Sequence, residues 1–188
     1  MSLIDLVRHG PALIDPAISP SAWRLTDDGR AAVRQLAARM DFNNVSFIAS
    51  STERKAIETA EILADQGGVS VRVWPGLQEL TAEWFNRSDD LQQRFANYLQ
   101  GTADPAFEPW DRAAARVVKA VSAVHHAAHP GRTVVVSHGR ILTVYFSTIL
   151  GRRLPGKAWN RIQFPDWAVY DPERECIVEG FFSDFAGC

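Results

Sequence analysis

Apolar residues gather in four short blocks along the chain, and polar residues follow each block directly. The blocks span 3–7, 45–49, 69–74 and 133–136, and their Val, Ile and Leu content and length are typical of strands. Between them, apolar residues recur every three or four positions, which predicts helices after Thr26, from about 54 to 66, over 110–128 and over 141–150. This alternation favours an α/β fold with a mainly parallel sheet.

Capping signals mark where two of these helices begin. Thr26 precedes two aspartates and predicts the start of a helix of about fourteen residues. Ser50 and Glu53 have the spacing of a capping box, which places Arg54 in the first turn of the next helix. A cation is disfavoured at the positive end of a helix dipole, so Arg54 is expected to meet an anion bound there.

The rest of the chain fits a single domain over 1–188. Residues 81–109 mix aromatic and charged positions without a regular period and are expected to form a small helical cap insertion over the site. The tail predicts a hairpin of 167–170 and 176–179, turned at Asp171-Pro172. A length of 188 residues suits one core.

Bulk properties exclude several classes of partner. The net charge is −2 and the apolar fraction is 46%, without long basic runs or membrane-spanning stretches, so neither nucleic acid nor membrane is an expected partner. We expect a soluble, cytoplasmic protein, and the sequence leaves its oligomeric state open. Cys176 and Cys188 are too few for a disulfide framework or a zinc site and are expected to be free thiols.

Candidate chemistry lies at the ends of the predicted strands. Arg8 and His9 end the first strand, Arg54 and Glu79 follow the second and third, and His138 with Gly139 follows the fourth. Ligands bind at the carboxyl ends of strands in parallel sheets, so these residues should meet in one crevice.

Such a crevice suits phosphoryl transfer through a covalent phosphohistidine. A neutral His9 would attack phosphorus while Arg8, Arg54 and His138 hold the phosphoryl oxygens, and Gly139 would line the substrate site. Glu79 would act as general acid, with a pKa raised by burial and by the phosphate. The arginines supply positive charge, so neither a metal nor another cofactor is expected.

Several assignments have open alternatives. Arg54 could instead pair with Glu58 at i,i+4, and Glu83 could replace Glu79 as the acid. Three histidines have metal-like spacing at a helix end, where a solvated face is the favoured interpretation: His125, His126 and His129. Four aromatic residues could either pack the core or favour a substrate with a bulky leaving group: Trp23, Trp84, Phe85 and Trp159. Three arginines could either bind anions or be solvated: Arg24, Arg87 and Arg140.

The motifs resemble those of the histidine phosphatase superfamily, in its phosphoglycerate mutase-like branch. They are L-V-R-H-G at 6–10, L-T-x-x-G at 25–29, S-S-T-E-R-K-A-I-E-T-A at 50–60, L-x-E at 77–79 and V-S-H-G at 136–139. The resemblance implies that His9 is phosphorylated, that Arg8, Arg54 and His138 form the phosphate pocket, and that Glu79 is the proton donor. It also implies a three-layer α/β/α sandwich with an antiparallel sheet edge.

Two departures from the family pattern bear on the activity. Pro11-Ala12 stand where many members have Glu or Gln followed by Thr or Ser, and the segment by which mutases bind the phosphoglycerate carboxylate has no recognisable counterpart. Hydrolysis of small-molecule phosphate monoesters is therefore expected over mutase activity. The alternatives are a protein phosphohistidine phosphatase and a non-catalytic phosphate-binding or interaction protein.

Overall fold

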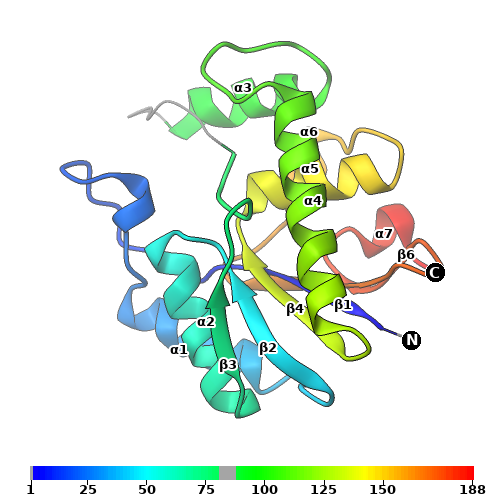
Figure 1. The fold of residues 1–188 in the computed structure, drawn as a ribbon. Helices are drawn as coiled ribbons and strands as arrows, with labels where there is room; N and C mark the ends of the chain where they lie inside the picture. Colours follow the sequence, from blue (N-terminus) through cyan, green and yellow to red (C-terminus); the bar gives the residue numbers. More distant parts are fainter. Residues whose placement is uncertain (1, 81–87) are drawn as a thin grey trace.

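The computed structural model describes residues 2–80 and 88–188, and its strands form one six-stranded mixed sheet in the order β3-β2-β4-β1-β5-β6 (Figure 1). The parallel strands are β1 (Ile4–Arg8), β2 (Val45–Ser50), β3 (Ser70–Val73) and β4 (Arg132–Ser137). The antiparallel edge is β5 (Asp166–Asp171) followed by β6 (Cys176–Gly180), the predicted hairpin.

Strand β1 lies inside the sheet, between β4 and β5, and all five of its residues are buried. Its register with β4 sets Val7 opposite Val136 and Arg8 opposite Ser137. The two strands are parallel, so the residues that follow them leave the sheet side by side. This register brings together two histidines that are 129 positions apart in the sequence, His9 and His138.

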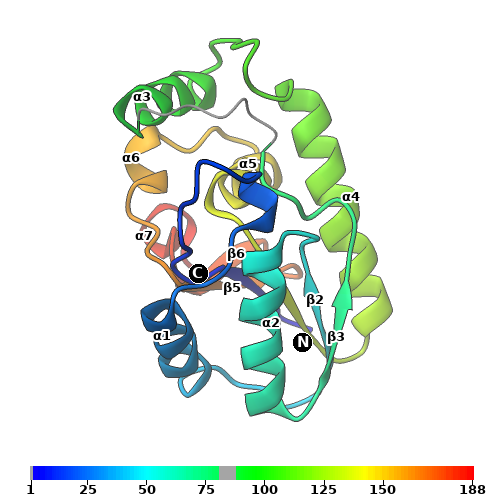
Figure 2. The ribbon, with the colours of Figure 1, turned by 90° about the vertical axis from the view of Figure 1, so that its left-hand side faces the viewer.

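Helices cover both faces of the sheet. Figure 2 shows α1 (Asp27–Ala37) and α2 (Arg54–Gly67) over one face, while α4 (Trp110–Ala128) and α5 (Gly139–Ile149) lie over the other. Alternate residues of β1 point to opposite layers, since Val7 packs in the α1/α2 core and Leu6 in the α4/α5 core. The expected three-layer sandwich with an antiparallel edge is confirmed.

The predicted caps differ in outcome. Thr26 caps α1, because its Oγ1 accepts the Gly29 N–H at 2.9 Å, although α1 has 11 residues rather than about fourteen. The predicted capping box of Ser50 and Glu53 is wrong, because the Ser50 hydroxyl donates to the Ser51 carbonyl at 2.9 Å. The Glu53 carboxylate instead lies within 2.5 Å of the Lys55 ammonium.

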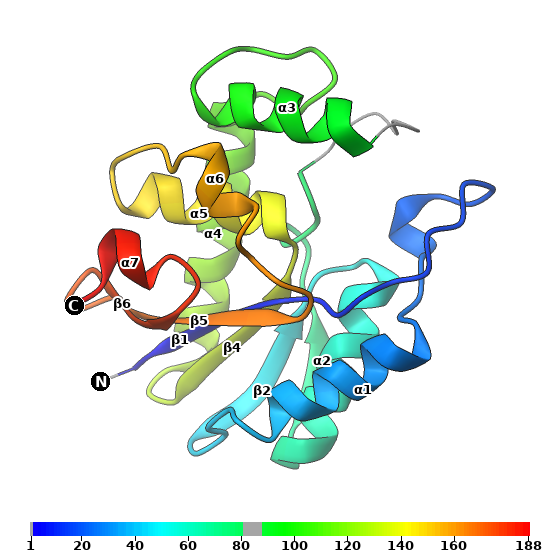
Figure 3. The ribbon, with the colours of Figure 1, turned by 180° about the vertical axis from the view of Figure 1, so that it is seen from behind.

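Part of the predicted cap is the helix α3 (Ser88–Leu99), which lies beyond the ends toward which β2 and β3 point (Figure 1). Figure 3 shows α3 beside the short helix α6 (Gly156–Trp159), and the rings of Phe95 and Trp159 are 4.8 Å apart. Trp159 is therefore partly buried and packs against the core. The remaining short helices are η1 (Pro20–Ala22) and α7 (Ser183–Ala186). Glu83, Trp84, Phe85 and Arg87 lie outside the described residues.

The expectation of two free thiols is wrong, because Cys176 and Cys188 form a disulfide with Cα atoms 5.2 Å apart. The C-terminus returns alongside β6, where the Cys188 N–H donates to the Ile177 carbonyl at 3.3 Å. This return is a tertiary event that cysteine spacing does not reveal.

Candidate active site

His9 has the features of a neutral nucleophile. Its Nδ1 lies 2.7 Å from the Gly10 carbonyl oxygen, and because a carbonyl only accepts, the ring proton is on Nδ1 and the lone pair on Nε2. Burial, then the neighbouring His138 and Lys55, hold the pKa of His9 well below its usual 6.5. The imidazole is therefore uncharged at neutral pH.

The backbone after His9 is fixed by two helices. The Gly10 N–H donates to Thr59 Oγ1 on α2 at 3.1 Å, and the Pro11 carbonyl accepts the Thr26 N–H at the start of α1, also at 3.1 Å. Ala12 pairs with Leu25 in a short antiparallel bridge. The backbone of Pro11-Ala12 thus holds the segment that follows His9 in place.

Arg8 lies flat between a glycine and an aromatic ring. A Cβ on Gly139 would meet its Cζ at 2.9 Å, and the Phe164 ring centroid is 3.2 Å from Cζ. Nη1 donates to the Ile162 carbonyl at 2.5 Å, whereas the buried Nε has no partner among the described residues. Burial lowers the pKa of Arg8 to about 10, so the guanidinium stays charged at neutral pH.

His138 is fully buried, with its ring centroid 5.1 Å from that of His9. Its Nε2 lies 2.7 Å from Ser51 Oγ, and its Nδ1 has no partner in the described part of the chain. Burial lowers the pKa of His138 to about 3, although Glu79 acts in the opposite direction. Both imidazoles of the site are therefore neutral without a ligand.

Glu79 is held as a carboxylate by the start of α5. Its Oε1 accepts the N–H groups of Leu80 at 2.8 Å and Ile141 at 2.9 Å, and Oε2 lies 3.2 Å from Arg140 Nε. Burial acts to raise the pKa of Glu79, but Arg140, His138 and these N–H donors outweigh it and lower the pKa to about 2. The expectation of a raised pKa is therefore wrong for the ligand-free protein.

Arg54 lies in the first turn of α2, as expected, and forms the i,i+4 pair with Glu58 that was the alternative to an anion contact. Its Nε donates to Glu58 Oε1 at 2.9 Å, and 40% of its side chain is exposed. None of its described contacts joins it to His9.

The neighbouring Lys55 was not anticipated from the sequence. Only 8% of its side chain is exposed, and its Nζ donates to Glu53 Oε2 at 2.5 Å and to the Pro20 carbonyl at 2.8 Å. Its charge lowers the pKa of both site histidines. The signal for it was helical position, since 55 shares the buried face of α2 with Ala56, Thr59 and Ala60.

Two more residues of the site, Ser51 and Phe164, were not predicted from the sequence. Ser51 is fully buried against His138, and the ring of Phe164, 46% exposed, lies 5.3 Å from the His9 ring. Ser51 follows a strand end directly, which is a weak signal. Phe164 lies in the irregular segment between α6 and β5, where no sequence pattern marks it. Trp23 is 9% exposed, and its ring lies near the Lys55 ammonium.

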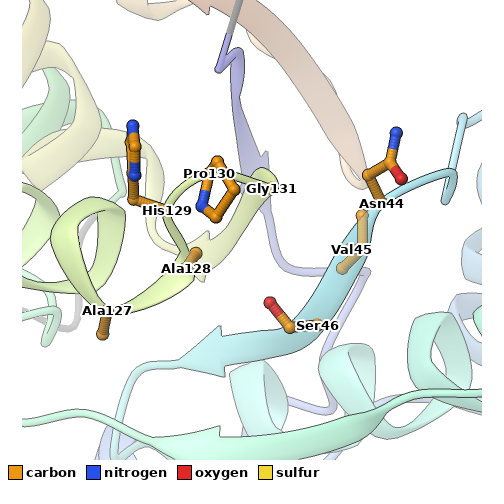
Figure 4. A pocket seen from close by; sticks show the side chains of 8 residues that line it. All are labelled: Asn44, Val45, Ser46, Ala127, Ala128, His129, Pro130 and Gly131. Atoms are coloured by element: carbon orange, nitrogen blue, oxygen red, sulfur yellow. The ribbon is translucent and has the colours of Figure 1, made fainter.

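A hollow of about 410 Å³ lies elsewhere, between the start of β2 and the turn from α4 to β4 (Figure 4). Residues 44–46 and 127–131 line it, at the opposite end of the strands from His9. Nearby, His125 Nδ1 lies 2.8 Å from Thr133 Oγ1. Within residues 2–80 and 88–188, no group of three or more His, Cys, Asp or Glu side chains is placed to hold a metal ion. No helix in these ranges is long and apolar enough to cross a membrane.

The chain is similar over its whole length to proteins named as mutases and shares its fold with solved phosphatases. A probable phosphoglycerate mutase GpmB from Erwinia tasmaniensis is 29% identical to this chain, and the alignment covers 100% of this chain and 93% of the mutase. A phosphoserine phosphatase from Entamoeba histolytica, solved with 3-phosphoglyceric acid, superposes with a TM-score of 0.76 at 16% identity, covering 96% and 97% of the two chains. A mycobacterial glucosyl-3-phosphoglycerate phosphatase gives 0.67 at 19% identity, covering 89% of each.

The model of the histidine phosphatase superfamily, branch 1, matches residues 4–174, a range that contains His9, Glu79 and His138. With the site at the carboxyl ends of β1 and β4, this match shows that the chain belongs to the histidine phosphatase superfamily.

Proposed function

We propose that the protein hydrolyses small-molecule phosphate monoesters through a covalent phosphohistidine on His9. One observation carries the proposal: a neutral His9 with its lone pair on Nε2 lies beside two buried nitrogens, Arg8 Nε and His138 Nδ1, that have no partner among the described residues. Oxygens of a bound phosphoryl group would satisfy these nitrogens, which are otherwise costly to bury.

The reaction has two displacements at phosphorus. His9 Nε2 forms the N–P bond as the ester P–O bond breaks, and Glu79 gives its proton to the departing alkoxide. Water then attacks phosphorus, the N–P bond breaks, and the Glu79 carboxylate takes the proton from the water. Because Glu79 is ionised in the free protein, the negative charge of the bound ester must raise its pKa before the first step.

The cations of the site would stabilise the phosphoryl charge without a metal or other cofactor. Arg8 is charged and its Nε is unpaired among the described residues. Lys55 is buried and acts electrostatically on both histidines, so we place it with Arg8, Arg54 and His138 as a candidate phosphate ligand. Arg54 would have to leave Glu58 to contribute. Gly139 contributes by admitting the Arg8 guanidinium.

Mutase activity is the second candidate, and it rests on the relatives named phosphoglycerate mutase. It can be tested by incubating the protein with 3-phosphoglycerate and following the products by phosphorus NMR. Release of inorganic phosphate without 2-phosphoglycerate supports hydrolysis. Accumulation of 2-phosphoglycerate would replace hydrolysis with isomerisation as the main activity.

Turnover of p-nitrophenyl phosphate in excess EDTA tests the proposed chemistry. We expect activity with the chelator present, a transient added phosphate in the intact mass, and loss of both in His9→Ala. His126→Ala is the matched control, because that histidine is exposed on α4. Turnover that persists in His9→Ala would exclude His9 as the nucleophile.

A wild type without turnover on any ester requires a binding measurement. Calorimetry with inorganic phosphate then separates the remaining classes: binding that depends on His138 and Arg8 without turnover indicates a non-catalytic phosphate-binding protein. A phosphohistidine peptide included among the substrates tests the protein phosphohistidine phosphatase alternative.

A further inference from the structure

The Ser51 hydroxyl has one hydrogen-bond acceptor among its described contacts. Ser51 Oγ accepts the backbone N–H of Glu53 at 3.3 Å and lies 2.7 Å from His138 Nε2. Ser51 is fully buried, and Nε2 is the acceptor for its proton among the described contacts. A buried hydroxyl donates where it can, so the Ser51 O–H points at Nε2.

The nearby carboxylate does not compete for the proton position on Nε2. Glu53 Oε1 is 3.6 Å from Nε2, but it accepts the Glu79 N–H at 2.9 Å. The other oxygen, Oε2, contacts the Lys55 ammonium at 2.5 Å. Both oxygens of Glu53 therefore have closer donors than the imidazole.

An imidazole that accepts at Nε2 carries its proton on Nδ1. In His138, Nδ1 is the buried nitrogen without a partner in the described part of the chain. We infer that Ser51 is a positioning residue that holds His138 as the Nδ1–H tautomer, so that the neutral ring donates this N–H to the phosphoryl group. The inference rests on the proposed function for the identity of the acceptor, whereas the tautomer itself does not depend on it.

The consequence is that His138 need not be charged to bind an anion. Lys55, Arg8 and Arg140 surround the ring with positive charge, while Glu79 and Glu53 are the nearby carboxylates. In the opposite tautomer, the Nδ1 lone pair would face the phosphoryl oxygens and repel them. Ser51 thus decides between attraction and repulsion at the same ring position.

Proton-detected ¹⁵N NMR of the histidine rings at neutral pH tests the tautomer directly. Loss of one ring's signals in His138→Gln identifies His138. We expect Nδ1 protonated and Nε2 bare in the wild type, with Nδ1 shifting when inorganic phosphate is added. A wild type with the proton on Nε2 overturns the inference, whatever its phosphatase activity.

Variants test whether the tautomer matters for binding. Ser51→Ala is expected to move the proton to Nε2 and to weaken inorganic phosphate binding about tenfold or more, the effect of one hydrogen bond to a charged group. Ser50→Ala is the matched control, because Ser50 is equally buried and its hydroxyl donates to the Ser51 carbonyl.

The outcomes separate the inference from the proposed function. The expected tautomer with unchanged phosphate affinity in Ser51→Ala overturns the positioning role and leaves the proposed phosphatase intact. A wild type with the expected tautomer that binds no phosphate instead overturns the proposed function and the anion that His138 was assigned.

Discussion

At the scale of single residues, the site combines neutral bases with fixed charges. The pKa of His9 and that of His138 are both lowered by burial, whereas Glu79 is held ionised by Arg140 and the start of α5. A phosphate dianion entering this site meets cations and neutral N–H donors, and its negative charge acts to raise the pKa of Glu79, so that this carboxylate can take up a proton from solvent.

The two adjacent cations of α2 can be compared directly. Lys55→Met should weaken inorganic phosphate binding about tenfold or more, because it removes the buried ammonium near His9. Arg54→Met is the matched change one position earlier, and it removes a half-exposed guanidinium paired with Glu58. Calorimetry measures the phosphate affinity of both variants, after thermal melts have shown that each is folded. A larger loss in Arg54→Met would return the phosphate-binding role to Arg54.

Glu79 predicts an acid-dependent contribution to stability. Its pKa falls from 4.5 to about 2 on folding, so the ionised group stabilises the fold fully above pH 4.5 and loses this contribution as pH falls toward 2. The difference in unfolding free energy between wild type and Glu79→Gln should shrink by about 2 kcal/mol between pH 6 and pH 3. Urea unfolding at both pH values measures it. A difference independent of pH would contradict the lowered pKa.

At the scale of elements, the helices α1 and α2 fix the loop that follows His9. Glu58 on α2 has 1% of its side chain exposed, accepts the Leu25 N–H at 3.0 Å and pairs with Arg30 at 2.6 Å. At the start of α1, Gly29 packs against the Pro11 carbonyl so closely that a Cβ would lie 2.2 Å from the oxygen.

Gly29→Ala should therefore destabilise the protein although it lies in a helix. Alanine normally favours a helix by about 1 kcal/mol over glycine, but here the added methyl displaces the backbone of Pro11, and we expect a net loss of about 2 kcal/mol. Ala31→Gly, at an exposed position of the same helix, measures the difference in helix propensity between alanine and glycine without the close contact. Urea unfolding of both variants decides, and a more stable Gly29→Ala would refute the close contact.

At the scale of the whole molecule, chemistry and cross-linking are separated in the sheet. His9, the proposed nucleophile, follows β1, while the disulfide joins the C-terminus to the edge strand β6, with β5 between them. We therefore expect that loss of this covalent link leaves the strand ends that carry His9 and His138 in place.

The disulfide provides the corresponding prediction. The double variant Cys176→Ser and Cys188→Ser opens a link between residues 12 positions apart and should cost about 2–3 kcal/mol of unfolding free energy. The kcat on p-nitrophenyl phosphate at 25 °C should stay within about twofold of the wild type, because the disulfide lies at the edge strand β6, which β5 separates from the strand that leads to His9. A tenfold change in kcat would need a change of about 1.4 kcal/mol in the activation free energy. Thiol titration of the denatured wild type without reductant should find no free thiol. Two reactive thiols would disprove the link.

The sequence alone predicted the six strands, the helices α1, α2, α4 and α5, and the positions of Arg8, His9 and His138 at strand ends, whereas Glu79 lies six residues beyond the end of β3. Hydrophobic periodicity and helix-end signals are local, so they can be read without the fold. The family motifs are local in the same sense.

Only the tertiary structure decided which neighbours those residues have. It buried Lys55 beside the histidines, placed Glu79 at the start of α5 and closed the disulfide, and of the two contacts that the sequence allowed for Arg54 it shows the pair with Glu58. The reason is physical: pKa values, ion pairs and tautomers depend on distances and burial between segments far apart in the chain, and sequence spacing does not encode these distances.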